Sequence, residues 1–527
     1  MLFPTLTFAL FFAVVLPLSW ALRDRTEVWK VMILIASYIF YGWWDWRFLG
    51  LIIAVTVVNE VAAVGIFRSE NDTTRKQMTA LAIAANLGLL GFFKYYGFFI
   101  SSLDRNLGIS APLLDVVLPV GISFFTFQGI SYVVDTYRRN MTPVPLLDAA
   151  VYLAFFPQLV AGPIVRASEF MPQLRNRRPA HLVPAGEAAL LIGRGLFKKV
   201  VISSFLADAI VDDVFATPKA FGSLDVLFGI YGYAIQIYAD FSGYTDIAIG
   251  VALLLGFQFP LNFDKPYAAV SIQDFWRRWH MTLSRWLRDY LYFPLGGNRG
   301  GQLKTYRNLL ITMTLGGLWH GAAGTFIAWG LYQGVALGLE RFVSTLRGEP
   351  DTPIGEGDIR MQEIAALHAG SKLEPWRADP TSPVPFVPIR VRNRWLARFV
   401  TFHLVCVGWV LFRADSLDRV GEIASALVSG LTVAPTLTTP LVVATIIVSL
   451  ATHFVPPLYG VQARAIVSRL PPAALGLGLG LWIFVVAALG PPGVSPFITS
   501  SSDAPIGFGA TIAPRIGLEN LRGMETT

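Results

Sequence analysis

Residues 306–334 read YRNLLITMTLGGLWHGAAGTFIAWGLYQG, and this stretch decides the class of fold. From Leu309 to Leu339 the chain has no formally charged side chain, apart from a proton that His320 can carry. A helix needs about 20 such residues to cross the ~30 Å hydrocarbon core of a bilayer. The stretch therefore predicts membrane-embedded sequence with one ionisable ring inside it.

Comparable apolar stretches recur along the chain. The 527 residues are 54% hydrophobic and only 15% charged, whereas a soluble domain has about 25% charged residues. Further nearly uncharged runs are Phe3–Leu22, Val31–Trp44, Phe48–Phe67 and Leu475–Leu489. This composition predicts an all-α polytopic membrane protein with roughly ten to twelve transmembrane or re-entrant helices, judged by span length.

Two features subdivide the chain. Residues 152–167, YLAFFPQLVAGPIVRA, contain two prolines and a glycine, which favours a broken or re-entrant segment because proline interrupts helix hydrogen bonding. Residues 346–395 are charged, rich in proline and without periodicity, as expected for a cytoplasmic insertion. We therefore expect one transmembrane domain over residues 1–495 and a polar tail over residues 496–527.

The net charge of +7 is best explained by basic loops on the cytoplasmic side, next to membrane lipid. No interleaved basic and aromatic module suggests binding to nucleic acid. The single cysteine, Cys406, excludes an intrachain disulfide and a cysteine-based zinc site. The six histidines are dispersed and lack the HExxH spacing, so we expect no metal site.

The first polar stretch inside apolar sequence is IYADFSGYTDIAIG (237–250). Asp240 and Tyr244 are four residues apart, as are Ser242 and Asp246, so each pair shares a face of a helix. Carboxylates in an apolar helix need a water-filled cavity or partners. Tyr238, Asp240, Ser242 and Asp246 are therefore candidates for lining a substrate channel; the alternative is a polar contact between closely packed helices.

The second stretch is SIQDFWRRWHMTLSRWLRDYLYFPLGGNR (271–299). Ser271 has the position and chemistry of a helix N-cap. Trp276, His280 and Ser284 follow at intervals of four, so we expect them to form one stripe of a continuous helix. Trp276 and Ser284, together with Trp319 further along the chain, are further candidates for lining a substrate channel. An amphipathic surface helix with arginines on lipid phosphate is the alternative. That alternative explains the arginines but gives no role to His280.

The third stretch surrounds His320, which follows Trp319 and lies among glycines. Small residues let another backbone or a substrate approach closely. Burial disfavours the charged form of an imidazole, so this ring would be neutral and able to accept a proton. A structural histidine bonded to a neighbouring helix is the alternative.

Several of these stretches together resemble the membrane-bound O-acyltransferase family. Within the family the likeness is to the bacterial branch that O-acetylates alginate and other polysaccharides. The matching stretches include YGWWDWRF (41–48), FFKYYGFF (92–99), PVGISFFTFQGISYVVDTYR (119–138), FFPQLVAGPIVR (155–166), YADFSGYTDIAIG (238–250), FPLNFDKPY (259–267), FWRRWHMTLSRWLRDYLYFPLGGNR (275–299), GGLWHGA (316–322) and GWVLFRA (408–414).

The resemblance implies a funnel-like helix bundle with a pore, in which His320 is the catalytic histidine and His280 occupies a second polar position. It implies a bacterial inner-membrane enzyme that transfers an acetyl group from a cytoplasmic thioester to an acceptor outside. The donor would be acetyl-CoA as a substrate, with no bound cofactor. Arg277, Arg278 and Arg299 are candidates for holding its phosphates. The expected partners are an exported polysaccharide such as alginate and periplasmic acetyltransferase proteins.

Two other functions remain open from the sequence. One is D-alanyl transfer to teichoic acid, which would require docking of a carrier protein. The other is a non-enzymatic polymer transporter in which Asp240, Asp246 and the histidines form a proton relay.

Overall fold

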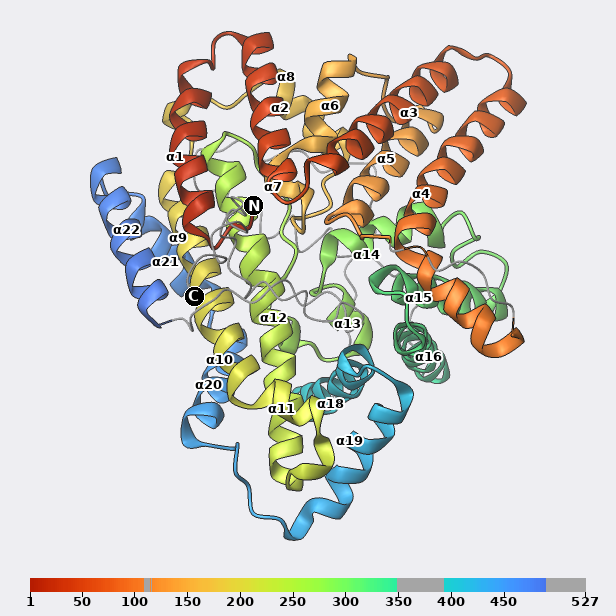
Figure 1. Cartoon of the computed structure of the whole chain (residues 1–527), viewed down its shortest axis with the longest axis vertical. Coiled ribbons are helices and arrows are strands. Elements are labelled where there is room, and N and C mark those ends of the chain that lie inside the picture. Colours follow the sequence, from red (N-terminus) through yellow and green to blue (C-terminus); the bar gives the residue numbers. More distant parts are fainter. Residues whose placement is uncertain (109–113, 115, 348–392, 490–527) are drawn as a thin grey trace, which may run out of the picture.

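The structure is a computed structural model that describes residues 1–108, 114, 116–347 and 393–489 (Figure 1). Within these residues the regular elements are all helices. The prediction of an all-α fold is confirmed. The expected insertion and tail lie almost wholly outside the described residues, so their boundaries stay predictions.

Among the residues that the structure describes, four helices are long and apolar enough to cross a membrane: Trp46–Arg68, Asp72–Asp104, Ser223–Leu254 and Arg394–Arg413. A bent pair, Pro440–Phe454 with Leu458–Val467, would make a fifth if it were counted as one span. These are fewer than the ten to twelve embedded segments expected from composition. Many of the apolar runs instead form helices that are too short for a full crossing or are interrupted, as at Phe155.

The N-terminal helices form the upper layer of the molecule in Figure 1. They are α1 (Leu6–Ala21), α2 (Thr26–Gly42), α3 (Leu49–Arg68), α4 (Asp72–Leu107) and α5 (Ile122–Tyr137). The buried amides of Asn59 on α3 and Asn86 on α4 bond each other reciprocally, at 3.1 and 2.9 Å. Such polar contacts hold helices together where the surroundings are apolar.

The break expected within residues 152–167 is confirmed. Helix α6 (Leu146–Ala154) stops at Phe155, and a single turn, α7 (Phe156–Leu159), follows before irregular chain leads to α8 (Ala167–Arg175). Pro157 fits the first turn of α7, where its missing N–H costs no helix bond. Whether the segment re-enters the membrane stays a prediction.

Helix α12 (Ser223–Leu254) runs through the centre of the molecule (Figure 1). Inside the protein, 83% of its apolar window is buried, against 22–39% for the other three candidate spans. Along it lies a chain of helical turns: α9 (Ala185–Leu196), π-helical Phe197–Ser203, α10 (Ser204–Leu206), π-helical Ala207–Val211 and α11 (Asp212–Ala216). The central helix therefore presents its polar residues to protein.

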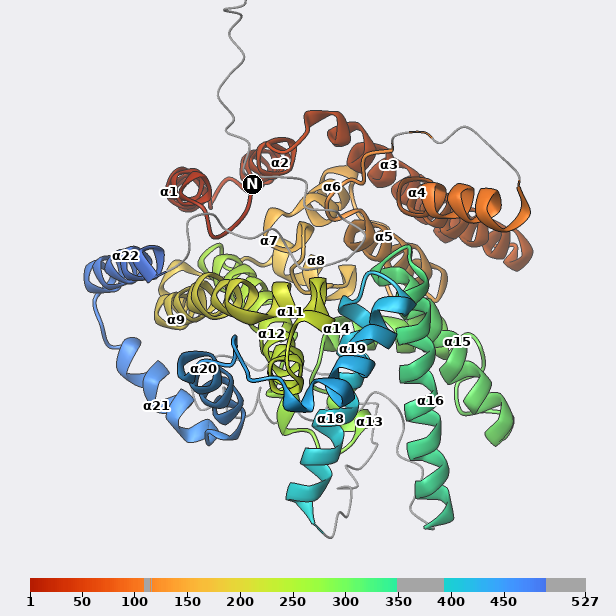
Figure 2. The ribbon, with the colours of Figure 1, turned by 60° about the horizontal axis from the view of Figure 1, so that its bottom comes forward.

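The remaining elements surround α12. Helices α15 (Gln302–His320) and α16 (Gly324–Leu346) form a closely packed pair on the side opposite α20–α22 in Figure 2. Their backbones nearly touch, because a Cβ on Gly317 would lie 2.3 Å from the carbonyl oxygen of Phe326. The others are α13 (Ile272–Trp276), α14 (Met281–Leu287), α18 (Arg394–Arg413), α19 (Leu417–Ser429), α20 (Pro440–Ala451), α21 (Pro457–Val467) and α22 (Pro472–Leu489).

Candidate active site

The helix expected through His280 is interrupted at that residue. Helix α13 ends at Trp276 and α14 begins at Met281, while His280 has the left-handed φ of 43°. The expected continuous stripe of Trp276, His280 and Ser284 is therefore wrong. Few residues other than glycine adopt this backbone conformation, and such strain concentrates at functional sites.

Hydrogen bonds from a separate segment impose the break. The backbone N–H of Asp264 donates to the carbonyl of Arg278 at 2.9 Å, and that of Met281 donates to the carbonyl of Asn262 at 3.0 Å. The start of α13 is fixed as predicted, because the Ser271 hydroxyl accepts from the Asp274 N–H at 3.1 Å. The chain before His280 and the chain after it are thus held by separate hydrogen bonds.

The His280 ring is enclosed by protein. The residue is 1% exposed, and its ring packs against Phe241 at 4.7 Å and Trp319 at 6.1 Å between centroids. Its Nδ1 lies 3.1 Å from Oδ1 of Asn262, while Nε2 is buried with no hydrogen-bond partner in the described part of the chain. Buried ring nitrogens are normally paired, so an open Nε2 marks a position for a ligand group.

His320 is the last residue of α15 and is half-buried. Its ring contacts those of Trp319 at 5.0 Å, Trp329 at 5.3 Å and Phe412 at 5.1 Å. Trp319 therefore touches both histidines and lies between them in the packing. The His320 ring is bounded by aromatic groups and keeps part of its surface accessible.

Helix α4 fixes the end of α15 that carries His320. The Tyr95 hydroxyl donates to the carbonyl of Leu318 at 2.7 Å, and Nζ of Lys94 donates to the carbonyl of Trp319 at 2.5 Å. The last carbonyls of a helix lack partners within it and attract cations. Lys94 was not predicted, although a lone lysine within the apolar run FFKYYGFF is a pattern that could have revealed it.

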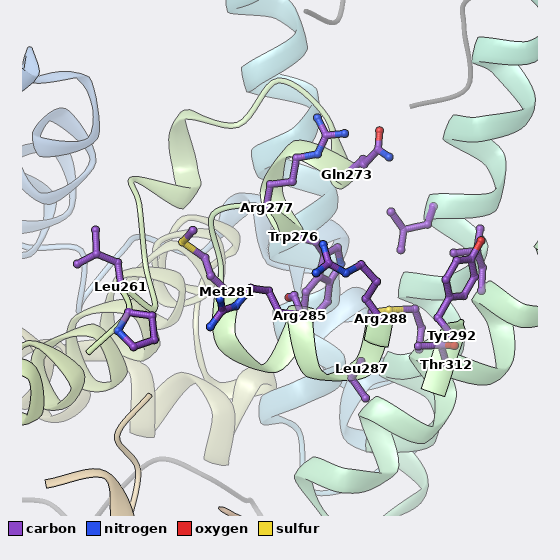
Figure 3. Close-up of a pocket in the computed structure, with 15 residues that line it drawn as sticks. Leu261, Gln273, Trp276, Arg277, Met281, Arg285, Leu287, Arg288, Tyr292 and Thr312 are labelled. Atoms are coloured by element: carbon purple, nitrogen blue, oxygen red, sulfur yellow. The ribbon is translucent and has the colours of Figure 1, made fainter. Parts of the chain in front are cut away.

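A pocket lies between the segment that carries α13 and α14 and the helices α15 and α16 (Figure 3). Its wall is mostly apolar, and three arginines contribute to it. Two residues expected to line a channel, Trp276 and Ser284, are in this wall. The lining consists of Pro260, Leu261, Gln273, Trp276, Arg277, Met281, Ser284, Arg285, Leu287, Arg288, Tyr292, Leu309, Thr312, Met313 and Leu337.

The pocket comes close to both histidines without including either. Met281 in its wall directly follows His280. The Trp276 ring, also in the wall, lies 5.7 Å from that of Trp329, which contacts His320. An apolar pocket with a few cationic groups suits a ligand that has an apolar arm and an anionic head.

Two of the pocket arginines are held by carboxylates. Arg285 pairs with Glu169 at 3.0 Å, and Arg288 pairs with Asp289 at 2.6 Å. Burial by itself raises the pKa of Asp289, but hydrogen bonding to Arg288 and the charge of Arg166 outweigh burial and lower it. Asp289 is therefore ionised at neutral pH and orients the Arg288 guanidinium.

The three arginines expected to hold phosphate separate in space. Arg277 lines the pocket, whereas Arg278 does not and pairs with Asp274 at 2.8 Å. Arg299 is exposed and also lies outside the lining. Arg285 and Arg288 were not predicted as candidates for holding phosphate. The interruption at His280 changes which side chains of this region face the pocket.

The polar residues of α12 face the neighbouring segment and not the pocket. Asp240 forms a buried ion pair with Lys199. Asp246 binds Arg194 at 2.6 Å and Lys198 at 2.9 Å. Lys198 also donates to Ser242 at 3.1 Å and lies 5.1 Å from the Tyr238 ring centroid. The geometry is that of polar contacts between packed helices.

The family model of the membrane-bound O-acyltransferases matches residues 38–352. The chain belongs to this family. It is therefore a membrane protein and an O-acyltransferase. Both histidines and every residue that lines the pocket lie within the matched range, whereas Phe412, which contacts His320, lies beyond it.

Similar proteins of known name support this assignment. A probable alginate O-acetylase of Pseudomonas syringae is 40% identical over 411 residues, which cover 76% of this chain and 70% of that protein. A peptidoglycan O-acetyltransferase of Helicobacter pylori is 35% identical over 426 residues, covering 76% and 73%. A teichoic acid D-alanyltransferase of Bacillus subtilis is 28% identical over 318 residues, covering 57% and 70%. The first two of these relatives match more of this O-acyltransferase than the third does.

Proposed function

We propose that this O-acyltransferase acts in the bacterial inner membrane and supplies acetyl groups to an exported polysaccharide, taking them from acetyl-CoA on the cytoplasmic side. The names of the alginate and peptidoglycan relatives support polysaccharide O-acetylation. The polymer itself, or a hydroxyl of a periplasmic acetyltransferase partner, is the acceptor in this proposal.

One observation carries the proposal. A half-buried imidazole, His320, contacts the same indole as a buried imidazole, His280, whose Nε2 is open. An arginine-lined apolar pocket adjoins them. We assign the pocket to the pantetheine arm of the donor and its arginines to the anionic groups, since guanidinium binds phosphate oxygens in a bidentate way.

The proposed reaction is a single acyl transfer. His320 takes the proton of the acceptor hydroxyl as general base while the hydroxyl oxygen attacks the thioester carbonyl carbon. The C–O bond forms, the C–S bond breaks, and the protonated His320 gives its proton to the departing thiolate, which leaves as the thiol. His280 positions the reacting groups. The aromatic surroundings of both rings keep water from competing with the acceptor.

The test is His320→Ala at matched protein level in the membrane. Because general-base catalysis contributes roughly 10²–10⁴-fold, polymer acetylation should fall by that factor. The control is His403→Ala, since His403 lies on α18 and bonds Tyr231 away from the site. Acetylation that persists in the His320 variant would contradict the proposal.

The Bacillus subtilis relative makes D-alanyl transfer the competing reaction to exclude. Membranes that contain the protein should consume labelled acetyl-CoA and release free CoA. If acylation occurs only when D-alanine is supplied on a carrier protein, the reaction is D-alanyl transfer and not acetyl transfer. If neither donor is consumed while polymer export depends on the protein, the transporter hypothesis would be favoured.

A further inference from the structure

We infer that Asn262 and Thr282 hold His280 in the tautomer that carries its proton on Nδ1, so that Nε2 presents a lone pair to the substrate. The tautomer follows from hydrogen bonds within the protein. Its use on a substrate rests on the proposed acyl transfer. Asn262 and Thr282 are positioning residues in this inference, since both act through His280.

The orientation of the Asn262 amide is set by a backbone group. The N–H of Thr282 lies 3.3 Å from Oδ1 of Asn262, and a backbone N–H can only donate. The amide atom in this position must therefore be the oxygen, because the alternative orientation would set two donors against each other. An amide oxygen accepts only, so Nδ1 of His280, 3.1 Å away, must carry the hydrogen.

The Thr282 hydroxyl extends this chain of hydrogen bonds, in which every donor and acceptor is fixed. It accepts from the backbone N–H of Ile164 at 3.0 Å, which leaves its own hydrogen for Oδ1 of Asn262, also at 3.0 Å. Asn262 and Thr282 are 1% and 2% exposed. Reversing any bond would leave a buried backbone donor unpaired, which is costly in the interior.

The same segment fixes where the ring points. The carbonyl of Asn262 accepts from the N–H of Met281 and its side-chain oxygen accepts from the N–H of Thr282, so Asn262 binds the two residues after His280 as well as the ring. The left-handed φ of His280 is held by this clamp. Asn262 therefore governs the backbone turn, the ring orientation and the tautomer of one residue.

This tautomer restricts what His280 can do. A neutral imidazole has one donor and one acceptor, and here the donor is used inside the protein. The open Nε2 then accepts a hydrogen bond and cannot donate one to a carbonyl oxygen. His280 accordingly binds a hydroxyl or amide N–H of a substrate and does not polarise the thioester carbonyl.

The decisive measurement is the ¹⁵N spectrum of the full-length protein labelled at histidine, in lipid at neutral pH. The His280 resonances are assigned as those missing from His280→Gln. We expect a protonated, pyrrole-type Nδ1 and an unprotonated, pyridine-type Nε2. The opposite pattern, or an imidazolium, would overturn the inference. Because this readout needs no turnover, it stands apart from the test of acyl transfer.

Variants then test whether the two partners set the tautomer. Asn262→Leu keeps the size and removes the acceptor; we expect the ¹⁵N pattern to lose its single tautomer and kcat to fall by about 10–100-fold, as for partners that orient catalytic imidazoles. Thr282→Val removes the hydroxyl donor but keeps the backbone N–H that orients the Asn262 amide, so we expect a smaller shift of the spectrum in the same direction, while Thr282→Ser should keep the wild-type pattern. An unchanged spectrum in Asn262→Leu would contradict the inference, and equal behaviour of the two Thr282 variants would contradict the role given to the Thr282 hydroxyl.

Discussion

Arg277 and Arg278 are adjacent in sequence but lie in different surroundings, which makes them a matched pair. Arg277 lines the pocket, and Arg278 is paired with Asp274 outside it. A hydrogen bond to a charged group contributes about 1.5–3 kcal/mol. Arg277→Gln should therefore raise KM for acetyl-CoA about tenfold or more with little change in kcat, and Arg278→Gln should leave KM unchanged. Equal KM values for the two variants would show that acetyl-CoA does not bind in this pocket.

Residue identity alone predicted part of the site. His280 and His320 stand out in the sequence because ionisable groups are rare in apolar segments, and the structure places both against Trp319. Lys94 shows the same signal in FFKYYGFF and was overlooked, whereas Asn262 could not be recognised in this way. Its importance comes from which atoms of distant segments it bonds, and no spacing along the chain encodes that.

At the scale of elements, the α15–α16 pair depends on the absence of a side chain at one position. A Cβ at Gly317 would lie 2.3 Å from the Phe326 carbonyl oxygen and 2.9 Å from the Cα of Gly330. Gly317→Ala should separate the helices, destabilise the protein by about 1–3 kcal/mol and displace the end of α15 that bears His320.

The control for this change is Gly324→Ala, because a Cβ there would meet no atom within 4 Å. The thermal unfolding temperature in detergent and the rate of acetyl transfer should both be lower in Gly317→Ala. Both should stay near the wild-type values in Gly324→Ala. Loss of activity in Gly317→Ala without loss of stability would show that the helix position matters to catalysis beyond folding.

Elements with local determinants were predictable. The Ser271 cap and the break within residues 152–167 depend on side chains in the same stretch, and both are observed. The interruption at His280 was not predicted, because FWRRWHMTLSRW contains neither proline nor glycine. There, hydrogen bonds from Asn262 and Asp264 override the local preference for a continuous helix.

At the scale of the whole molecule, a buried ion pair ties the central helix to its neighbour. Asp240 and Lys199 are almost fully buried. Removing one partner leaves a buried charge and costs about 3–5 kcal/mol, whereas replacing both by apolar groups is often tolerated. Asp240→Leu should therefore lower the amount of folded protein, and Asp240→Leu with Lys199→Met should restore much of it.

The double variant also distinguishes a structural role of this ion pair from a role in a proton relay. If the pair is structural, acetyl transfer per folded molecule should be retained in the double variant, measured by labelled acetyl release at matched protein level. A proton relay through Asp240 would instead leave the double variant folded and inactive. The second outcome would show that Asp240 has a role in the reaction beyond holding the helices together.

Composition predicted the helical membrane class of the whole molecule but not its arrangement. The carboxylates of α12 suggested a lined channel, yet their partners Arg194, Lys198 and Lys199 come from a segment that precedes the helix. Long-range pairing of this kind depends on how segments pack. For the same reason, hydropathy could not show that α12, among the candidate spans, is the most enclosed.

The bonds from Lys94 and Tyr95 to the end of α15 have a mechanical consequence. The candidate span in α4 runs 33 residues, and at ~1.5 Å per residue it is longer than the ~30 Å core of a bilayer, a mismatch that tilting of the helix can absorb. Any change of tilt acts on the peptide carbonyls of Leu318 and Trp319, one bond network away from the His320 imidazole. A bilayer whose thickness changed this tilt would therefore act, through these backbone hydrogen bonds, on the position of the proposed general base.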